Sequence, residues 1–223
     1  MKIVDLKKLL PRSFKRAAPR ALRSLCDSVA YRLVRQLSGD REFRRIVFVC
    51  KGNVCRSPFA EHYLRSLGVG ANVWIDSCGL EVDKKGGSPP EAIRIAEEFG
   101  LDLSAHRSKG MSECDLQGAD LIVAMEYYQY LRLRSMFPEK KGKVRLLRDF
   151  APWPKSLICN IYDPYGLGID EFENCFKKIQ RAITELNSNL ASFEVIEPQI
   201  SLEDDSTMKS SGTGSPKRRY EKI

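Results

Sequence analysis

The 223-residue sequence predicts an α/β fold: a three-layer α-β-α sandwich around a central, mostly four-stranded parallel sheet. Short runs rich in Val, Ile and Leu alternate with longer helical patterns, which is the order expected of β-α-β units. A parallel sheet built in this way is covered by helices on both faces. An apolar content of 43% with 30% charged residues is typical of a globular protein.

The elements of the sandwich are expected in alternating order along the chain. Strands are predicted at residues 46–49, 73–76, 121–124 and 144–147. Helices are predicted at residues 58–67, 90–99, 126–136 and about 170–192.

A basic amphipathic helix is predicted ahead of the sandwich, at about residues 19–38, with Gly39 as its C-terminal stop. Its apolar residues recur at helical spacing: Leu22, Leu25, Cys26, Val29, Leu33 and Leu37. We expect this stripe to pack on the body of the protein or on a partner. Contact with an anionic membrane surface is the alternative, because basic amphipathic helices suit such surfaces. The third alternative is that this segment is a poorly ordered arm.

The positive charge of the chain is concentrated in this extension. Residues 1–45 hold 13 Lys and Arg against 4 Asp and Glu, whereas residues 46–193 hold 19 of each. The central domain is therefore neutral, and nothing in it is typical of a nucleic-acid reader. The sequence divides into a basic helical extension (1–45), a central domain (46–192) and a polar tail (193–223) that we expect to be disordered.

The cysteine content indicates the compartment. Seven cysteines are scattered through the chain, an odd number that favours a reduced, cytoplasmic protein. The basic N-terminal segment lacks the continuous apolar stretch of a secretory signal. No apolar run approaches the roughly 20 residues that cross a bilayer.

Residues 46–60, IVFVCKGNVCRSPFA, carry the strongest chemical signal. An apolar strand ends at Cys50, a short loop follows, and a helix opens with Pro58 in its first turn. The loop thus lies at the carboxyl end of a parallel strand, where open α/β sheets bind ligands. Its backbone N–H groups and the helix dipole favour an anion, Gly52 lets the backbone turn, and Arg56 can hold two oxygens of a phosphate-like group.

Cys50 is predicted to be a nucleophile at the floor of this phosphate loop. The field that attracts an anion also lowers a cysteine pKa from about 8.5 into roughly the 3.5–7.5 range, and a thiolate below a phosphate can attack phosphorus. A zinc site would need two further Cys or His ligands at suitable spacing, and the sequence has only two histidines, His62 and His106. If the two cysteines were merely buried in the core without a catalytic role, the Arg, Ser and Pro that follow them would be unexplained. No metal or cofactor is expected.

The segment CKGNVCRSP resembles the signature loop of the low-molecular-weight protein tyrosine phosphatases, C-x-G-N-x-C-R-S-P after an apolar strand. The resemblance covers about residues 46–192, including DSCGL at 76–80, ADLIVAME at 119–126 and DPYG at 163–166. It implies that Cys50 attacks phosphorus while Arg56 and the loop amides hold the phosphate oxygens. It also implies that Asp163 protonates the leaving group and then activates the water that releases phosphate from a phosphocysteine.

The resemblance assigns supporting roles to further residues. Asn53 would brace the loop, Ser57 would stabilise the thiolate, and Ser77 with His106 would complete that hydrogen-bond network. Cys55 would form a protective disulfide with Cys50 under oxidant. Tyr165 would form one wall of the substrate cleft. The implied partner is a protein carrying phosphotyrosine, and by analogy with bacterial relatives a tyrosine kinase of polysaccharide export.

Three positions depart from the family pattern and bear on the substrate. Asp83 stands where the family commonly has the tryptophan of the other cleft wall, so the slot should be wider and more polar. Lys51 replaces a small or apolar loop residue and would favour a more anionic substrate. Val54 stands where protein-arginine phosphatases carry Thr, which favours a phosphate ester over phosphoarginine. Other substrates with the same mechanism, arsenate reduction and a non-catalytic phosphate-binding module remain as alternatives.

Overall fold

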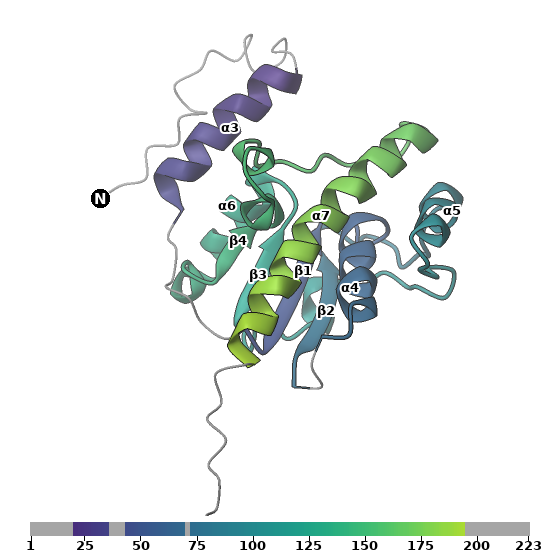
Figure 1. Ribbon diagram of the computed structural model, residues 1–223, viewed down its shortest axis with the longest axis horizontal. Coiled ribbons are helices and arrows are strands. Elements are labelled where there is room, and N and C mark those ends of the chain that lie inside the picture. Colours follow the sequence, from purple (N-terminus) through teal and green to yellow (C-terminus); the bar gives the residue numbers. More distant parts are fainter. Residues whose placement is uncertain (1–19, 36–42, 70–71, 195–223) are drawn as a thin grey trace, which may run out of the picture.

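The structure is a computed structural model that describes residues 20–35, 43–69 and 72–194. Its centre is a sheet of four parallel strands in the order β2-β1-β3-β4 (Figure 1). The strands are β1 (Arg45–Cys50), β2 (Trp74–Gly79), β3 (Leu121–Ala124) and β4 (Val144–Leu146). All three pairings are parallel, so the predicted α/β class and parallel sheet are confirmed.

Helices cover both faces of the sheet and form two separate cores. The helices of the sandwich are α4 (Arg56–Ser66), α5 (Pro90–Glu98), α6 (Tyr127–Met136) and α7 (Ile169–Glu194). Ile46 and Phe48 of β1 pack with α4, α5 and α7, whereas Val47 and Val49 pack with α6. Alternate residues of one strand thus serve opposite faces, which makes the molecule three-layered. Short 3-10 helices complete the fold at Met111–Glu113, Pro138–Lys140, Leu147–Phe150 and Lys155–Leu157.

The observed elements differ from the predicted ones mainly at their ends. β2 runs on to Gly79 because β1 offers a parallel partner along its whole length, with Cys50 paired to Gly79. α4 begins at Arg56, which places Pro58 inside the first turn, where a missing N–H costs nothing. The extension before residue 20 and the polar tail from residue 195 lie outside the described residues, and α7 continues to Glu194.

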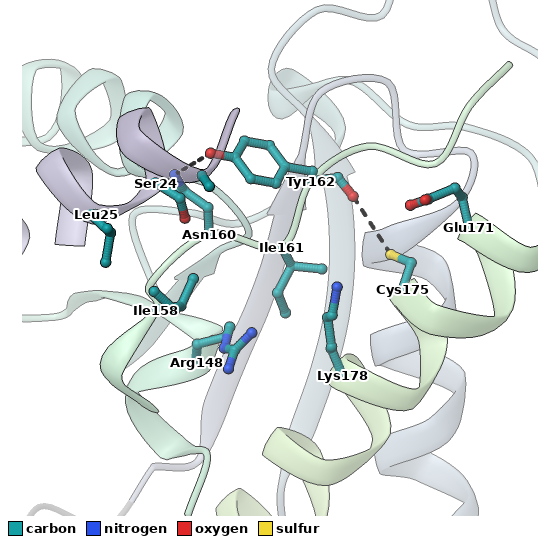
Figure 2. Close-up of a pocket in the computed structure, with 11 residues that line it drawn as sticks. Ser24, Leu25, Arg148, Ile158, Asn160, Ile161, Tyr162, Glu171, Cys175 and Lys178 are labelled. Atoms are coloured by element: carbon teal, nitrogen blue, oxygen red, sulfur yellow. Dashed lines mark hydrogen bonds between the residues drawn. The ribbon is translucent and has the colours of Figure 1, made fainter. Parts of the chain in front are cut away.

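The predicted basic helix is present as α3 (Arg20–Val34), but its orientation corrects one form of the expectation, that its apolar stripe packs on the body, while packing on a partner stays a prediction. The stripe faces outward: the exposed fractions are 38% for Leu22, 51% for Leu25, 53% for Val29 and 73% for Leu33. The opposite face is buried and mostly polar, through Ser24, Asp27, Ser28 and Tyr31. The body offers hydrogen-bond partners there, in the segment around Asn160 beside which α3 lies (Figure 2). Residues 19 and 36–38 of the predicted helix lie outside the described residues.

Candidate active site

The phosphate loop, residues 51–55, connects β1 to α4 and rests on the end of β2. The N–H of Leu80 donates to the carbonyl of Cys50 at 3.0 Å, and that of Glu81 to the carbonyl of Lys51 at 2.8 Å. A Cβ on Gly79 would lie 2.9 Å from both the Lys51 oxygen and the carbonyl carbon of Gly52. The loop therefore sits so close to β2 that only glycine fits below it.

Cys50 lies at the floor of this loop and is 2% exposed. The backbone N–H of Asn53 donates to its sulfur at 3.2 Å, and the hydroxyl of Ser57 donates to it at 3.1 Å. Two donors thus converge on the sulfur of Cys50 from the loop and from α4.

Asn53 holds the loop in its turned conformation. Its φ angle is 53°, in the left-handed region that Asn tolerates better than most residues. Its side-chain amide donates to Ser57 Oγ at 2.9 Å and to Ser77 Oγ at 2.8 Å, and its Oδ1 accepts from the N–H of Lys109 at 2.8 Å. With an exposed fraction of 0%, Asn53 connects the loop, α4, β2 and the segment after α5.

His106 supports the same network from outside. Its Nε2 lies 2.7 Å from the backbone oxygen of Asn53, a contact that requires the nitrogen to carry the proton. Burial lowers the pKa of His106, against the smaller raising effects of this hydrogen bond and of Glu61. His106 thus serves as a neutral donor to the loop.

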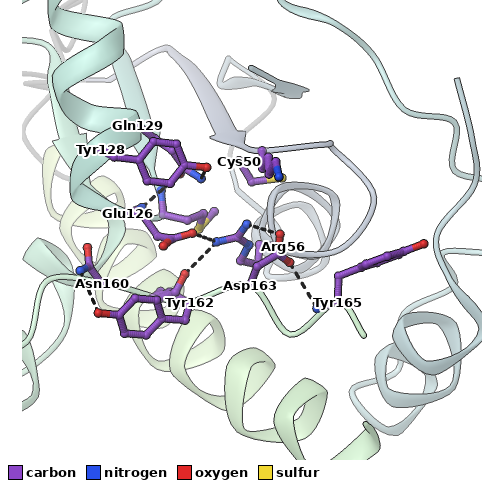
Figure 3. Close-up of polar contacts among 12 residues, drawn as sticks. Cys50, Arg56, Glu126, Tyr128, Gln129, Asn160, Tyr162, Asp163 and Tyr165 are labelled. Atoms are coloured by element: carbon purple, nitrogen blue, oxygen red, sulfur yellow. Dashed lines mark hydrogen bonds and ion pairs between the residues drawn. The ribbon is translucent and has the colours of Figure 1, made fainter. Parts of the chain in front are cut away.

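Arg56, the first residue of α4, is 1% exposed and meets two carboxylates. Its Nη1 donates to Glu126 at 2.5 Å and to the carbonyl of Ile161 at 3.0 Å, and its Nη2 pairs with Asp163 at 2.7 Å (Figure 3). Burial opposes the charge, but Cys50, Asp163 and Glu126 outweigh it and raise the pKa of Arg56. Its buried Nε has no partner among the described residues, so this N–H can donate to an anion.

The DPYG turn brings Asp163 to the loop but leaves Tyr165 at the rim. The Asp163 side chain is 36% exposed, and its Oδ1 accepts from the N–H of Tyr165 at 3.4 Å. Tyr165 itself is 64% exposed, and Figure 3 shows its ring turned away from Cys50.

The remaining predicted site residues surround the loop. Lys51 is exposed, with its ammonium 4.0 Å from Glu81. Gly52 and Val54 are partly buried, and Val54 packs on the core below α4. Cys55 is 2% exposed, and burial, with added effects of Asp163 and Cys50, raises its pKa. All seven cysteines are free thiols.

Sequence reasoning missed three residues that the fold adds to the site. Glu126 pairs with Arg56, Glu61 accepts from Ser77 Oγ at 2.6 Å, and Tyr128 lies beside Glu126 facing the site (Figure 3). Glu126 follows β3, the neighbour of β1, and this carboxyl-end position was the available signal. The other two have no signal in the sequence, because the contact of Glu61 with Ser77 and the orientation of Tyr128 arise only when the helices pack on the sheet.

Comparison with known proteins identifies the family. The family model described as low molecular weight phosphotyrosine protein phosphatase matches residues 45–195. The protein-tyrosine-phosphatase Wzb of Escherichia coli K12 is 35% identical over 140 residues, which are 63% of this chain and 90% of Wzb. The protein-arginine-phosphatase of Bacillus subtilis is 29% identical over 147 residues, or 65% and 95% of the two chains.

A solved structure agrees with this assignment. The tyrosine phosphatase Wzb of Escherichia coli K30, in complex with sulphate, superposes with a TM-score of 0.59 at 30% identity and covers 66% of this chain and 99% of Wzb. The match extends over the sheet, the phosphate loop and α7, and it leaves α3 outside the family model. The chain belongs to the low molecular weight phosphotyrosine protein phosphatase family, whose members are cysteine-dependent hydrolases.

Proposed function

We propose that the protein hydrolyses phosphotyrosine in proteins through a phosphocysteine intermediate. The observation that carries the proposal is the convergence of Cys50, Arg56 and Asp163 on one loop, with two donors on the sulfur and a buried, unpartnered Nε on the arginine. A binding module would need the loop and Arg56, but it would have no use for an acid beside them.

The proposed reaction has two steps. In the first, the Cys50 thiolate forms a bond to phosphorus as the P–O bond to tyrosine breaks, and Asp163 gives its proton to the leaving oxygen. In the second, water attacks phosphorus, Asp163 takes the proton of that water, and the P–S bond breaks to release phosphate and the thiolate. Arg56 and the loop amides stabilise the charge on the three equatorial oxygens in both steps.

Tyrosine is the substrate that the surroundings of the loop support best. Tyr128 faces the site and can contact a phenyl ring although Asp83 occupies the usual tryptophan position, and Tyr165 stands exposed at the rim, where it would have to turn toward Cys50 to form a second wall. Sulphate bound to the related Wzb is an anion of the kind that the loop would hold. Phosphoarginine is the second candidate, since an arginine phosphatase is among the relatives, but Val54 offers no hydroxyl to orient water on a P–N bond.

The decisive assay is hydrolysis of a phosphotyrosyl peptide in buffer with chelator. We expect turnover by the native protein, none by Cys50→Ser, and a fall of about 10²-fold or more in kcat for Asp163→Ala, within the range of general acid catalysis. Native-like turnover by Cys50→Ser would refute the phosphocysteine. Faster release of phosphate from a phosphoarginine peptide than from the phosphotyrosyl peptide would mean that phosphoarginine, and not phosphotyrosine, is the substrate.

We further propose a cytoplasmic enzyme that acts on a tyrosine kinase and approaches anionic membranes through residues 1–45. The outward stripe of α3 and the excess of basic residues in this segment support a peripheral contact. None of the described helices is long and apolar enough to cross a membrane. The native protein should sediment with vesicles containing phosphatidylserine, and Leu33→Ser with Val29→Ser should weaken this. Equal sedimentation of both would refute the contact.

A further inference from the structure

We propose that Asp27 and Ser28 of α3 position the general acid, by clasping the segment that leads to it. This segment, residues 158–163, is called the acid segment here. The inference rests on the proposed function, and it gives the extension a role in the reaction. Because α3 lies outside the family match at residues 45–195, the clasp is a device that this chain adds to the family domain.

The clasp consists of direct hydrogen bonds between buried groups. Asp27 Oδ2 accepts from the side-chain amide of Asn160 at 2.9 Å, and Ser28 Oγ accepts from the N–H of Cys159 at 3.0 Å. The exposed fractions of Asp27, Ser28 and Asn160 are 5%, 3% and 4%. Both side chains are shielded from water, so breaking this hydrogen bond would leave buried polar groups without a partner, and Asp27 therefore restrains Asn160.

Asn160 passes this constraint to the active site. Its Oδ1 accepts from the N–H of Tyr127 at 2.8 Å, which ties the segment to the start of α6 next to Glu126. The next residue, Ile161, offers its carbonyl to Arg56 Nη1 at 3.0 Å, and Asp163 follows two positions later. A shift of Asn160 would therefore move the acid and a partner of Arg56 together.

Packing alone does not hold the acid segment on the α3 side. A cavity of about 480 Å³ lies there, between α3, the acid segment and α7 (Figure 2). Its walls include Ile158, Ile161 and Tyr162 of the acid segment and Leu25 of α3. Ile161 packs in the core, but Ile158 and Tyr162 are only partly buried on this side, so the clasp adds a restraint where packing is incomplete.

Two substrates separate a positioning role from a general structural one. A leaving group that is already a weak base, such as p-nitrophenolate, needs little help from an acid, whereas tyrosine needs a proton. We expect Asp27→Ala and Ser28→Ala each to lower kcat/KM on a phosphotyrosyl peptide about 10-fold, a part of what the acid contributes, because kcat/KM reports the step in which the leaving group is protonated. The kcat/KM on p-nitrophenyl phosphate and the inhibition constant of inorganic phosphate should change less than about 2-fold.

Two matched variants serve as controls. Asp27→Asn keeps an oxygen that can accept from Asn160, so it should retain most of the native rate. Val29→Ser changes the outward face of the same helix, and it should leave the rates on both substrates unchanged. Hydrogen exchange gives a readout that needs no turnover: amides of residues 159–163 should exchange faster in Asp27→Ala and Ser28→Ala than in Val29→Ser.

Each outcome decides the proposal. A lower kcat/KM on the phosphotyrosyl peptide alone, together with faster amide exchange in residues 159–163, supports the clasp. Unchanged rates for both alanine variants overturn it, and so does an equal loss on both substrates with weaker phosphate inhibition, which would mean general damage to the loop. If the native protein hydrolyses neither substrate, the proposed function fails, and hydrogen exchange still tests whether α3 restrains the acid segment.

Discussion

Arg56 shows how a buried charge is accommodated at a single residue. Its guanidinium lies between Glu126 and Asp163, and two neighbouring carboxylates offset the cost of removing the charge from water. The planar fork also fixes the direction of each donor, which Lys could not do. The unpartnered Nε is then held ready for the substrate by contacts made elsewhere on the same group.

The pairing of Arg56 with Glu126 predicts a graded mutational effect. Glu126→Ala should lower kcat/KM about 10- to 100-fold, because a hydrogen bond to a charged group is worth ~1.5–3 kcal/mol. Glu126→Gln keeps an acceptor oxygen, so its kcat/KM should fall clearly less than that of Glu126→Ala. Steady-state kinetics on a phosphotyrosyl peptide measure both, and equal losses would show that the charge rather than the hydrogen bond matters.

The lowered pKa of His106 predicts a dependence of stability on pH. An unfolded histidine titrates near about 6.5, whereas burial lowers the pKa in the folded protein. As the pH falls below the unfolded value, the unfolded state binds more protons and the free energy of unfolding decreases, until the folded pKa is passed. Glu61, His62 and Lys109 also act on this ring, but more weakly than burial.

Urea unfolding at pH 7 and pH 5.5 checks this expectation. The loss of stability at the lower pH should be smaller in His106→Gln, which retains a donor for the Asn53 carbonyl but does not titrate. His62→Gln is the matched control and should keep most of the native pH dependence. An undiminished loss in His106→Gln would contradict the assignment.

At the scale of elements, the site is made by the ends of three neighbouring strands. β1 ends on the nucleophile, β3 ends before Glu126, and β2 supports the loop from below. Each contribution depends on the register of the parallel pairs, since Cys50 pairs with Gly79 and Val49 with Ala124. One residue of slippage would separate the loop from its support.

The close approach of β2 to the loop predicts the effect of a single methyl group. In Gly79→Ala, the new Cβ would lie 2.6 Å from Val82 Cγ2 as well as 2.9 Å from the loop backbone. We expect a loss of about 1–3 kcal/mol of stability from overpacking, together with a reduced kcat. Gly86→Ala is the control, because its Cβ would meet nothing within 4 Å. Thermal unfolding and kinetics of the two variants should differ clearly, and equal behaviour would refute the packing argument.

At the scale of the whole molecule, α3 is attached to the sandwich mainly through polar and aromatic contacts. Tyr31, 3% exposed, donates to Asp149 at 2.8 Å, accepts from the N–H of Leu146 at 3.2 Å and packs edge-on against Tyr130 with ring centroids 4.9 Å apart. Burial and the nearby Asp149 raise the pKa of Tyr31, which keeps the hydroxyl a donor. The extension is therefore part of the folded body along α3.

This anchorage predicts that one oxygen atom matters for the stability of the molecule. Tyr31→Phe leaves the buried N–H of Leu146 and a carboxylate oxygen of Asp149 without this hydroxyl, at a cost of about 1–3 kcal/mol. Urea unfolding measures the loss. Tyr63→Phe, at a hydroxyl without a hydrogen bond among the described residues, should cost much less, and similar losses for the two would contradict the role of Tyr31.

The sequence by itself determined the fold class and the phosphate loop, because both are local patterns. Strand and helix periodicity identified the α/β order, and the spacing from Cys50 to Pro58 fixes which groups can meet one phosphate. The supporting residues Asn53, Ser57, Ser77 and His106 were named through the resemblance, and the structure places them in contact with one another through Asn53.

The tertiary structure decided what depends on contacts between distant segments. The apolar stripe of α3 predicted a packed face, but the polar face is buried, since Asp149, Cys159 and Asn160 offer hydrogen bonds that periodicity cannot reveal. Glu126 and Glu61 joined the site in the same way, through strand order and helix packing. A sequence records which groups a chain carries, whereas the pairing of buried polar groups, and with it the link from α3 to Asp163, is set only when the chain folds.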